Sequence, residues 1–168
     1  MGGSRRFLSN SLNNILRKIV SLLRVYNIND WFIGYGTLLG IVRNNSCINM
    51  DDDIDIVLNI KQKNLLIKLL EDNKFKIVTL KEDFMKVVIN DSIPPIDFYL
   101  ATVDGNGNFN DTWEKTTWSN VYPLLVRKWY DVNLFLPSNY TTKLVNRYGD
   151  DWKIPKQSKG IDPKKTII

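Results

Sequence analysis

Four aspartates occupy five consecutive positions of this chain, immediately before an apolar run that is typical of a buried strand. The segment reads Asp51-Asp52-Asp53-Ile54-Asp55-Ile56-Val57-Leu58. Side chains alternate between the two faces of a strand, so Asp51, Asp53 and Asp55 are predicted to project from one face, with the isoleucines entering the core on the other. Asp52 is predicted to face away from the other three acids. Any fold of this chain must therefore place several carboxylates side by side at the edge of its core.

This arrangement favours a bound cation, because neighbouring like charges make each carboxylate harder to ionise. A divalent ion requires two or three hard anionic oxygens that converge from one side, and these residues supply them. The alternative is a solvated acidic loop, which is the usual structure of an aspartate run. A calcium loop of the EF-hand type does not fit, because Ile56 stands where glycine is required and Gln62 where glutamate is required.

The composition restricts the metal and the chemistry. The chain has no histidine, and Cys47 is its one cysteine. Zinc sites built on His and Cys, internal disulfides, and Ser-His-Asp or Cys-His catalysis are therefore excluded. Mg²⁺ or Mn²⁺ held by carboxylates is the metal that remains. The net charge of +5 comes from scattered lysines, Lys86 among them, so a solvated basic surface is expected and nucleic acid is an unlikely partner.

Hydrophobic periodicity predicts an α/β (α+β) fold, with a mixed β-sheet flanked by helices, as a single domain over residues 1–168. Helices are expected over residues 8–25, 37–43, 61–72 and about 140–147, the third with Leu65, Leu66, Leu69 and Leu70 on its inner face. Strands are expected over residues 31–34, 54–58, 75–80, 85–89 and 96–101, whereas Trp113 and Trp118 are placed in an irregular stretch.

The ends of the chain carry little pattern. Residues 1–6 are expected to form a loosely ordered leader, and residues 156–168 a loosely held tail. No apolar run approaches the length of a transmembrane segment, and the N-terminal region is too polar for a signal peptide. The expectation is therefore a soluble, intracellular protein.

Two further motifs accompany the aspartates. Upstream, Ile33-Gly34-Tyr35-Gly36-Thr37-Leu38-Leu39-Gly40 reads as a strand, a glycine pair and a helix start, and backbone amides at a helix N-terminus favour phosphate. A structural turn explains this motif equally well. Downstream, Asp97 stands alone in the apolar strand Pro95-Ile96-Asp97-Phe98-Tyr99. A buried aspartate is costly unless it binds metal or pairs with a lysine or arginine, so both roles are open for Asp97.

Together these motifs resemble the polymerase-β-like nucleotidyltransferase superfamily. Within it, Gly36-Thr37-Leu38-Leu39-Gly40-Ile41-Val42-Arg43 followed by the aspartate run is similar to the LicD and fukutin family of phosphocholine and phospho-sugar-alcohol transferases. The ending Arg147-Tyr148-Gly149-Asp150-Asp151-Trp152-Lys153-Ile154-Pro155 resembles the Tyr-Gly-x-x-Trp-x-x-Pro ending of that family. The chain departs from the family in having Asn49-Met50 where Pro-Trp usually precedes the acidic triplet, which bears on donor or acceptor recognition.

The resemblance implies a metal-dependent enzyme that transfers a phospho-alcohol group, such as phosphocholine or a sugar-alcohol phosphate, from a CDP-linked donor to a glycan acceptor, releasing CMP. It implies that Asp53 and Asp55 bind Mg²⁺ or Mn²⁺, and that Asp97 is a further metal ligand or the general base. Gly36 and Thr37 would hold donor phosphate. Arg43 would neutralise phosphate charge, or else be a surface residue or a partner of the acids.

Two other functions remain open at this point. One is a true nucleotidyltransferase that moves a nucleoside monophosphate from an NTP to a small molecule, a protein or RNA. The other is an inactive copy of the fold that acts as a binding module. The presence of Asp53, Asp55 and Asp97 favours an enzyme over this second alternative.

Overall fold

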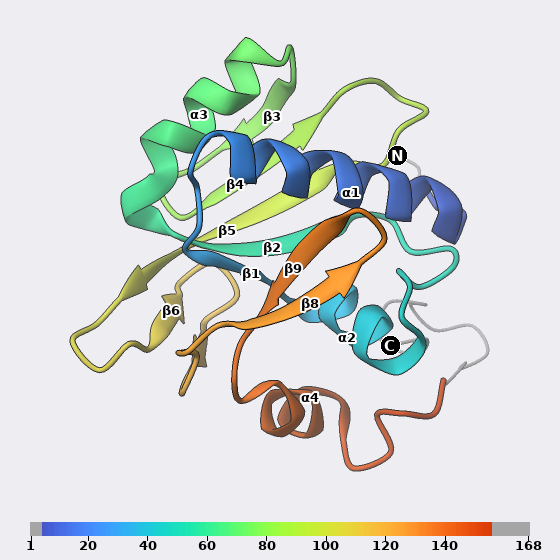
Figure 1. Cartoon of the computed structure of the whole chain (residues 1–168), viewed down its shortest axis with the longest axis vertical. Coiled ribbons are helices and arrows are strands. Elements are labelled where there is room, and N and C mark those ends of the chain that lie inside the picture. The colour runs from blue at the N-terminus through green and yellow to red at the C-terminus, as the bar shows by residue number, and fades with distance from the viewer. Residues whose placement is uncertain (1–4, 156–168) are drawn as a thin grey trace.

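A computed structural model describes residues 5–155, and Figure 1 shows its helices and strands. The predicted tail (156–168) and the first four residues of the predicted leader lie outside this range. The elements follow in the order α1 (Ser9–Val25), β1 (Trp31–Ile33), α2 (Tyr35–Asn44), β2 (Ile54–Asn59), a short 3-10 turn (Ile60–Gln62), α3 (Lys63–Asp72), β3 (Lys76–Leu80), β4 (Phe84–Val88), β5 (Ile96–Val103), β6 (Phe109–Asp111), β7 (Thr116–Trp118), β8 (Leu125–Trp129), β9 (Val132–Leu136) and α4 (Tyr140–Tyr148).

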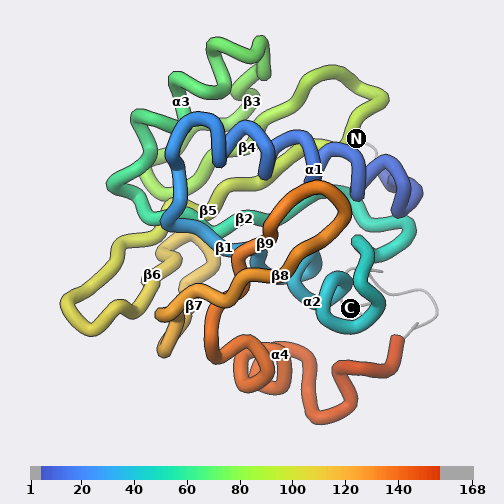
Figure 2. Tube along the Cα trace, viewed as in Figure 1, coloured from blue at the N-terminus to red at the C-terminus, as the bar shows by residue number. Residues whose placement is uncertain are grey.

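The main sheet has the strand order β1-β2-β5-β4-β3 and is mixed, because β2 and β5 are parallel while the other pairs along it are antiparallel. β6 pairs with the end of β5 and with β7. The hairpin β8–β9 forms a separate sheet that lies against α1 and β1, and its path can be followed in the chain trace of Figure 2. The predicted fold class, a mixed sheet flanked by helices, is confirmed.

The helix α1 forms because its apolar residues recur every three or four positions and make one stripe. Leu12, Leu16, Ile19 and Leu23 are completely buried along this stripe. Figure 1 shows α1 lying across the sheet, with α3 beside β3. In α3 the structure corrects one expectation. Leu65 is 44% exposed, because the buried stripe of this short helix runs through Leu66, Leu69 and Leu70 and leaves Leu65 at its edge.

The region after residue 108 is more regular than its sequence indicates. Trp118 was expected in an irregular stretch, but it lies in β7 and packs against Phe32 and Tyr35, with ring centroids 5.0 and 5.3 Å apart. β6 and β7 have three residues each, which is too short for an alternating pattern to be recognised. The strands of the β8–β9 hairpin were not predicted either. Among residues 5–155, no helix is long and apolar enough to cross a membrane.

Candidate active site

The acidic residues form part of a row of side chains that crosses three strands. Asp55 on β2 is paired with Asp97 on β5, and Asp97 is paired in turn with Lys86 on β4. Residues that are paired across a sheet point to the same face. The row Asp55, Asp97, Lys86 therefore lies on one face of the sheet. The next row along, Ile56, Phe98 and Met85, lies on the opposite face and is completely buried.

Three carboxylates converge at this row. Carboxylate oxygens of Asp53, Asp55 and Asp97 lie within 4.8 Å of one another, and the three residues are only 4 to 6% exposed. The hydroxyl of Tyr99 donates a hydrogen bond to Oδ1 of Asp55 at 3.0 Å, which holds that carboxylate in place. Burial, followed by the charge of Asp55, raises the pKa of Tyr99, so the phenol remains a donor at neutral pH. This set of closely spaced hard oxygens fits Mg²⁺ or Mn²⁺.

Lys86 is a residue of this site that sequence reasoning missed, as it also missed Tyr99. Its Nζ atom lies 2.7 Å from Oδ1 of Asp97 and 3.8 Å from Oδ2 of Asp53. Burial by itself lowers the pKa of Lys86, but the charges of Asp97 and Asp53 outweigh it and raise the pKa. Of the two roles considered for Asp97, the pairing with a lysine is present, and metal binding stays a prediction for a carboxylate that lies beside those of Asp53 and Asp55. The available signal was a single lysine in the apolar strand Met85-Lys86-Val87-Val88.

Asp52 was expected to face away from the other acids, and this prediction is wrong. The residue is 6% exposed, and its carboxylate lies within 4.8 Å of those of Asp51 and Asp53. The alternation argument fails here because β2 begins at Ile54. Residues 51–53 follow a tight bend at Met50, whose φ is 70°, and Phe7 pairs with Asp51. The backbone N–H of Asp51 donates to the carbonyl oxygen of Ile48 at 3.2 Å, and the pairing of β2 with β5 begins only at Ile54, so the alternation of β2 does not extend to residues 51–53.

The glycine motif places the start of α2 against the acids. A Cβ atom on Gly36 would lie 3.1 Å from Oδ2 of Asp51 and 3.7 Å from Oδ2 of Asp55, so glycine leaves open the space next to these carboxylates. Thr37 is buried, and its Oγ1 accepts a hydrogen bond from the backbone N–H of Asp55 at 2.9 Å. Thr37 therefore ties α2 to β2, and this structural role stands beside the predicted contact with phosphate.

Arg43, for which contact with phosphate was one of the predicted roles, is half-buried. The guanidinium of Arg43 makes a long 3.5 Å contact with the carbonyl oxygen of Trp152, and burial lowers its pKa. Arg147 on α4, to which no role was assigned, lies over the ring of Tyr35 at 4.6 Å and so brings a positive charge to the first residue of α2. The pKa of its neighbour Tyr148 is affected by one of the acids. Burial, opposed by Arg147 and reinforced by the charge of Asp55, raises the pKa of Tyr148 to about 12.

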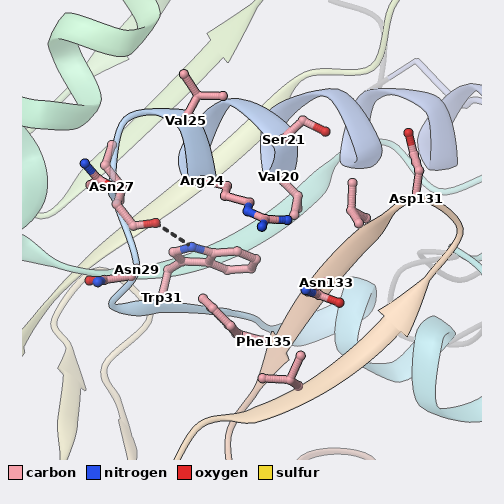
Figure 3. A pocket seen from close by; sticks show the side chains of 13 residues that line it. Val20, Ser21, Arg24, Val25, Asn27, Asn29, Trp31, Asp131, Asn133 and Phe135 are labelled. Atoms are coloured by element: carbon pink, nitrogen blue, oxygen red, sulfur yellow. Dashed lines mark hydrogen bonds between the residues drawn. The ribbon is translucent and has the colours of Figure 1, made fainter.

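Two cavities lie on opposite faces of the main sheet. One of about 400 Å³ is bordered by Asp52, Asp53 and Lys86, together with Arg5 and Asn90. This is the size of a small-molecule site, and the cavity opens onto Asp52 and Asp53. A larger cavity of about 500 Å³ lies between α1, β1 and the β8–β9 hairpin (Figure 3).

The larger cavity belongs to the other side of the sheet from the acids. It is lined by Trp31, which is paired with Leu58, three residues along β2 from Asp55. An odd separation along a strand places two side chains on opposite faces. Figure 3 shows Trp31 and Phe135 beneath Arg24 of α1, and none of the acids described above is among the lining residues. The smaller cavity is therefore the one that belongs to the candidate active site.

Comparison with known proteins places this geometry in context. The model of the family described as LicD/FKTN/FKRP, nucleotidyltransferase domain, matches residues 28–156. A search of curated proteins finds no match.

Several solved structures share the fold. The lincomycin-bound lincosamide antibiotic adenylyltransferase LnuA has a TM-score of 0.55 at 18% identity, over 83% of this chain and 85% of that one. ANT(2'')-Ia in complex with adenylyl-2''-tobramycin has a TM-score of 0.61 at 15% identity, over 84% and 77%. An antigenic nucleotidyltransferase-like protein from Paracoccidioides brasiliensis has a TM-score of 0.55 at 14% identity, over 85% and 69%. At these identities the likeness establishes the fold alone.

Proposed function

Because this chain belongs to the LicD/FKTN/FKRP nucleotidyltransferase-domain family, we propose that it transfers a phospho-alcohol group, such as phosphocholine or a sugar-alcohol phosphate, from a CDP-linked donor to a glycan hydroxyl. Its family and its fold are those of a transferase of the nucleotidyltransferase type. The observation that carries the proposal is the convergence of Asp53, Asp55 and Asp97 within 4.8 Å, next to the open space at Gly36.

In the proposed reaction, the oxygen of the acceptor hydroxyl forms a bond to the phosphorus atom that bears the alcohol. The bond between this phosphorus and the bridging oxygen of the pyrophosphate breaks, and CMP leaves with that oxygen. The hydroxyl proton passes to a carboxylate, for which Asp97 is our candidate. Asp97 suits this role because the ion pair with Lys86 and the neighbouring strands hold its side chain in one orientation.

The proposed metal ligands are Asp53 and Asp55, with Asp97 as the third carboxylate. A bound Mg²⁺ or Mn²⁺ would neutralise the charge that develops on the pyrophosphate. Tyr99 orients Asp55 through its hydrogen bond, and Gly36 leaves room for a donor phosphate beside the first backbone amides of α2. For Arg43, the contact with the carbonyl oxygen of Trp152 supports a role in holding the segment after α4 against α2 more than it supports direct binding of phosphate.

A thermal-shift panel with Mg²⁺ or Mn²⁺ tests the proposal, because a ligand that binds the native state raises the melting temperature. The panel contains CDP-choline, CDP-ribitol, CTP, ATP and GTP, and Asp53→Ala is the control variant. We expect the CDP-linked compounds to stabilise the wild-type protein with metal present and to have no effect on the variant.

Other outcomes of the panel point to other functions. A response to ATP or GTP without any response to cytidine compounds, together with pyrophosphate release, would favour nucleotidyl transfer instead. If every nucleotide stabilises the Asp53→Ala protein as much as the wild type, the chain is a binding module and the proposed active site is wrong.

A further inference from the structure

Lys86 lies beside two of the acids that are proposed to bind a cation, where a second positive charge would repel that cation. It projects from β4 in the same row as Asp97 and Asp55, and its ammonium lies 2.7 Å from Asp97 and 3.8 Å from Asp53. Both of these aspartates belong to the group of three whose oxygens lie within 4.8 Å of one another. The ammonium of Lys86 thus lies within reach of two of the three proposed ligands.

The surroundings of Lys86 favour its ion pairs with Asp97 and Asp53. Its side chain is 33% exposed, whereas those of Asp53 and Asp97 are 5% and 8% exposed, so the ion pair is shielded from water mainly on the side of the acids. The antiparallel register places Lys86 directly across from Asp97, and the lysine cannot reach the other face of the sheet. Its remaining exposed surface borders the 400 Å³ cavity that opens onto Asp52 and Asp53.

From this geometry we propose that Lys86 is an internal counter-ion that competes with the divalent cation for Asp53 and Asp97. Without metal, its charge offsets the repulsion between the buried carboxylates and stabilises the fold. When metal binds, the same fixed charge repels it and keeps its affinity moderate, so that metal enters readily with a negatively charged donor. Lys86 is thus a positioning residue rather than a catalytic one, and the inference rests on the metal site of the proposed function.

The test compares two properties of purified protein, the melting temperature after treatment with EDTA and the dissociation constant for Mn²⁺ from calorimetric titration. Lys86→Met removes the charge and keeps much of the length, and Lys86→Arg retains the charge. Lys76→Met, at an exposed lysine on β3, is the matched control for the loss of one positive charge elsewhere on the sheet.

We expect Lys86→Met to melt at a lower temperature than Lys76→Met in EDTA, and to bind Mn²⁺ about tenfold more tightly than the wild type. Even in a water-like dielectric, the repulsion between a unit charge and a dication at a few ångström is of that order, so tenfold is the smallest effect expected at this shielded site. Lys86→Arg should resemble the wild type in both measurements. If Lys86→Met folds in the presence of Mn²⁺ but not in EDTA, the inference is supported, because the metal replaces the missing charge.

Three results would overturn the inference. One is an unchanged or weaker affinity for Mn²⁺ in Lys86→Met, and another is a loss of melting temperature no larger than that of Lys76→Met. The third is a failure of Lys86→Met and of Lys86→Gln to fold even with Mn²⁺ present. In all three the proposed function survives if the wild type binds Mn²⁺ and Asp53→Ala does not. If the wild type itself binds no divalent cation, it is the proposed metal site that fails.

Discussion

Replacing Gly36 by alanine should separate the stability of this protein from its ability to bind a donor. Gly36 is the second residue of α2, and its φ is negative, so alanine meets no backbone strain there. Alanine favours a helix by about 0.5–1 kcal/mol over glycine. Against this gain, the new Cβ would lie 3.1 Å from Oδ2 of Asp51, and that half-buried carboxylate must move by a few tenths of an ångström. We expect the free energy of unfolding to change by less than about 1 kcal/mol, a shift of no more than roughly 4 °C in the melting temperature.

Binding should respond differently, because the methyl group fills the space beside the carboxylates of Asp51 and Asp55. We expect the affinity for a CDP-linked donor, measured by calorimetry with Mn²⁺, to fall by about tenfold or more, which corresponds to about 1.4 kcal/mol.

Gly40→Ala in the same helix is the control, since its Cβ would lie 2.5 Å from the backbone oxygen of Ser46. Overpacking of this kind costs about 1–3 kcal/mol of stability. The folded Gly40→Ala protein should bind the donor normally. Normal donor affinity in Gly36→Ala would refute the reasoning.

Three further substitutions probe single contacts of the site. Asp53→Ala should abolish both the stabilisation by Mn²⁺ and the turnover while leaving the fold intact by circular dichroism, and full turnover in this variant would show that the metal is held elsewhere. Asp97→Asn should slow single-turnover transfer by about 10²- to 10⁴-fold with nearly normal donor binding if Asp97 is the base. A parallel fall in donor affinity would identify a metal ligand instead, and unchanged turnover with a lower melting temperature would leave Asp97 with a purely structural role. Tyr99→Phe removes the buried hydrogen bond to Asp55, so it should lower the stability by about 1–3 kcal/mol in denaturant titration, and an unchanged midpoint would contradict this.

Patterns that depend on the local chain were predictable. The helix α1 and the strand β2 could each be predicted from the periodicity of a single segment, because the buried residues of each element recur at regular spacing along its own sequence. The same alternation predicted that Asp55 projects from the face of β2 opposite Ile54 and Ile56, and it equally pointed to Tyr99, two residues after Asp97 on β5. This second inference was available and was not drawn.

Features that depend on where segments meet were not predictable in this way. Asp52 turns toward the acids because residues 50 and 51 bend against Phe7, a contact between positions more than forty residues apart. The short strands β6 and β7 form because the end of β5 pairs with β6, β6 pairs with β7, and Trp118 of β7 packs on Phe32. Neither the pairing of strands nor the contact with Phe32 can be recognised from the three residues that each of these strands contains.

The sequence alone thus singled out the candidate site residues, because carboxylates in an apolar frame are costly unless they are paired or bound to metal. The tertiary structure decided what those residues contact. The register of β4 against β5 brings Lys86 to Asp97, and the register of β5 against β2 brings Asp97 to Asp55. A shift of one residue in either pairing would move a whole row of side chains to the other face of the sheet. Register is set by packing over the entire sheet. For that physical reason, the position of Lys86 beside Asp97 and Asp53 could not be predicted from any single segment of the chain.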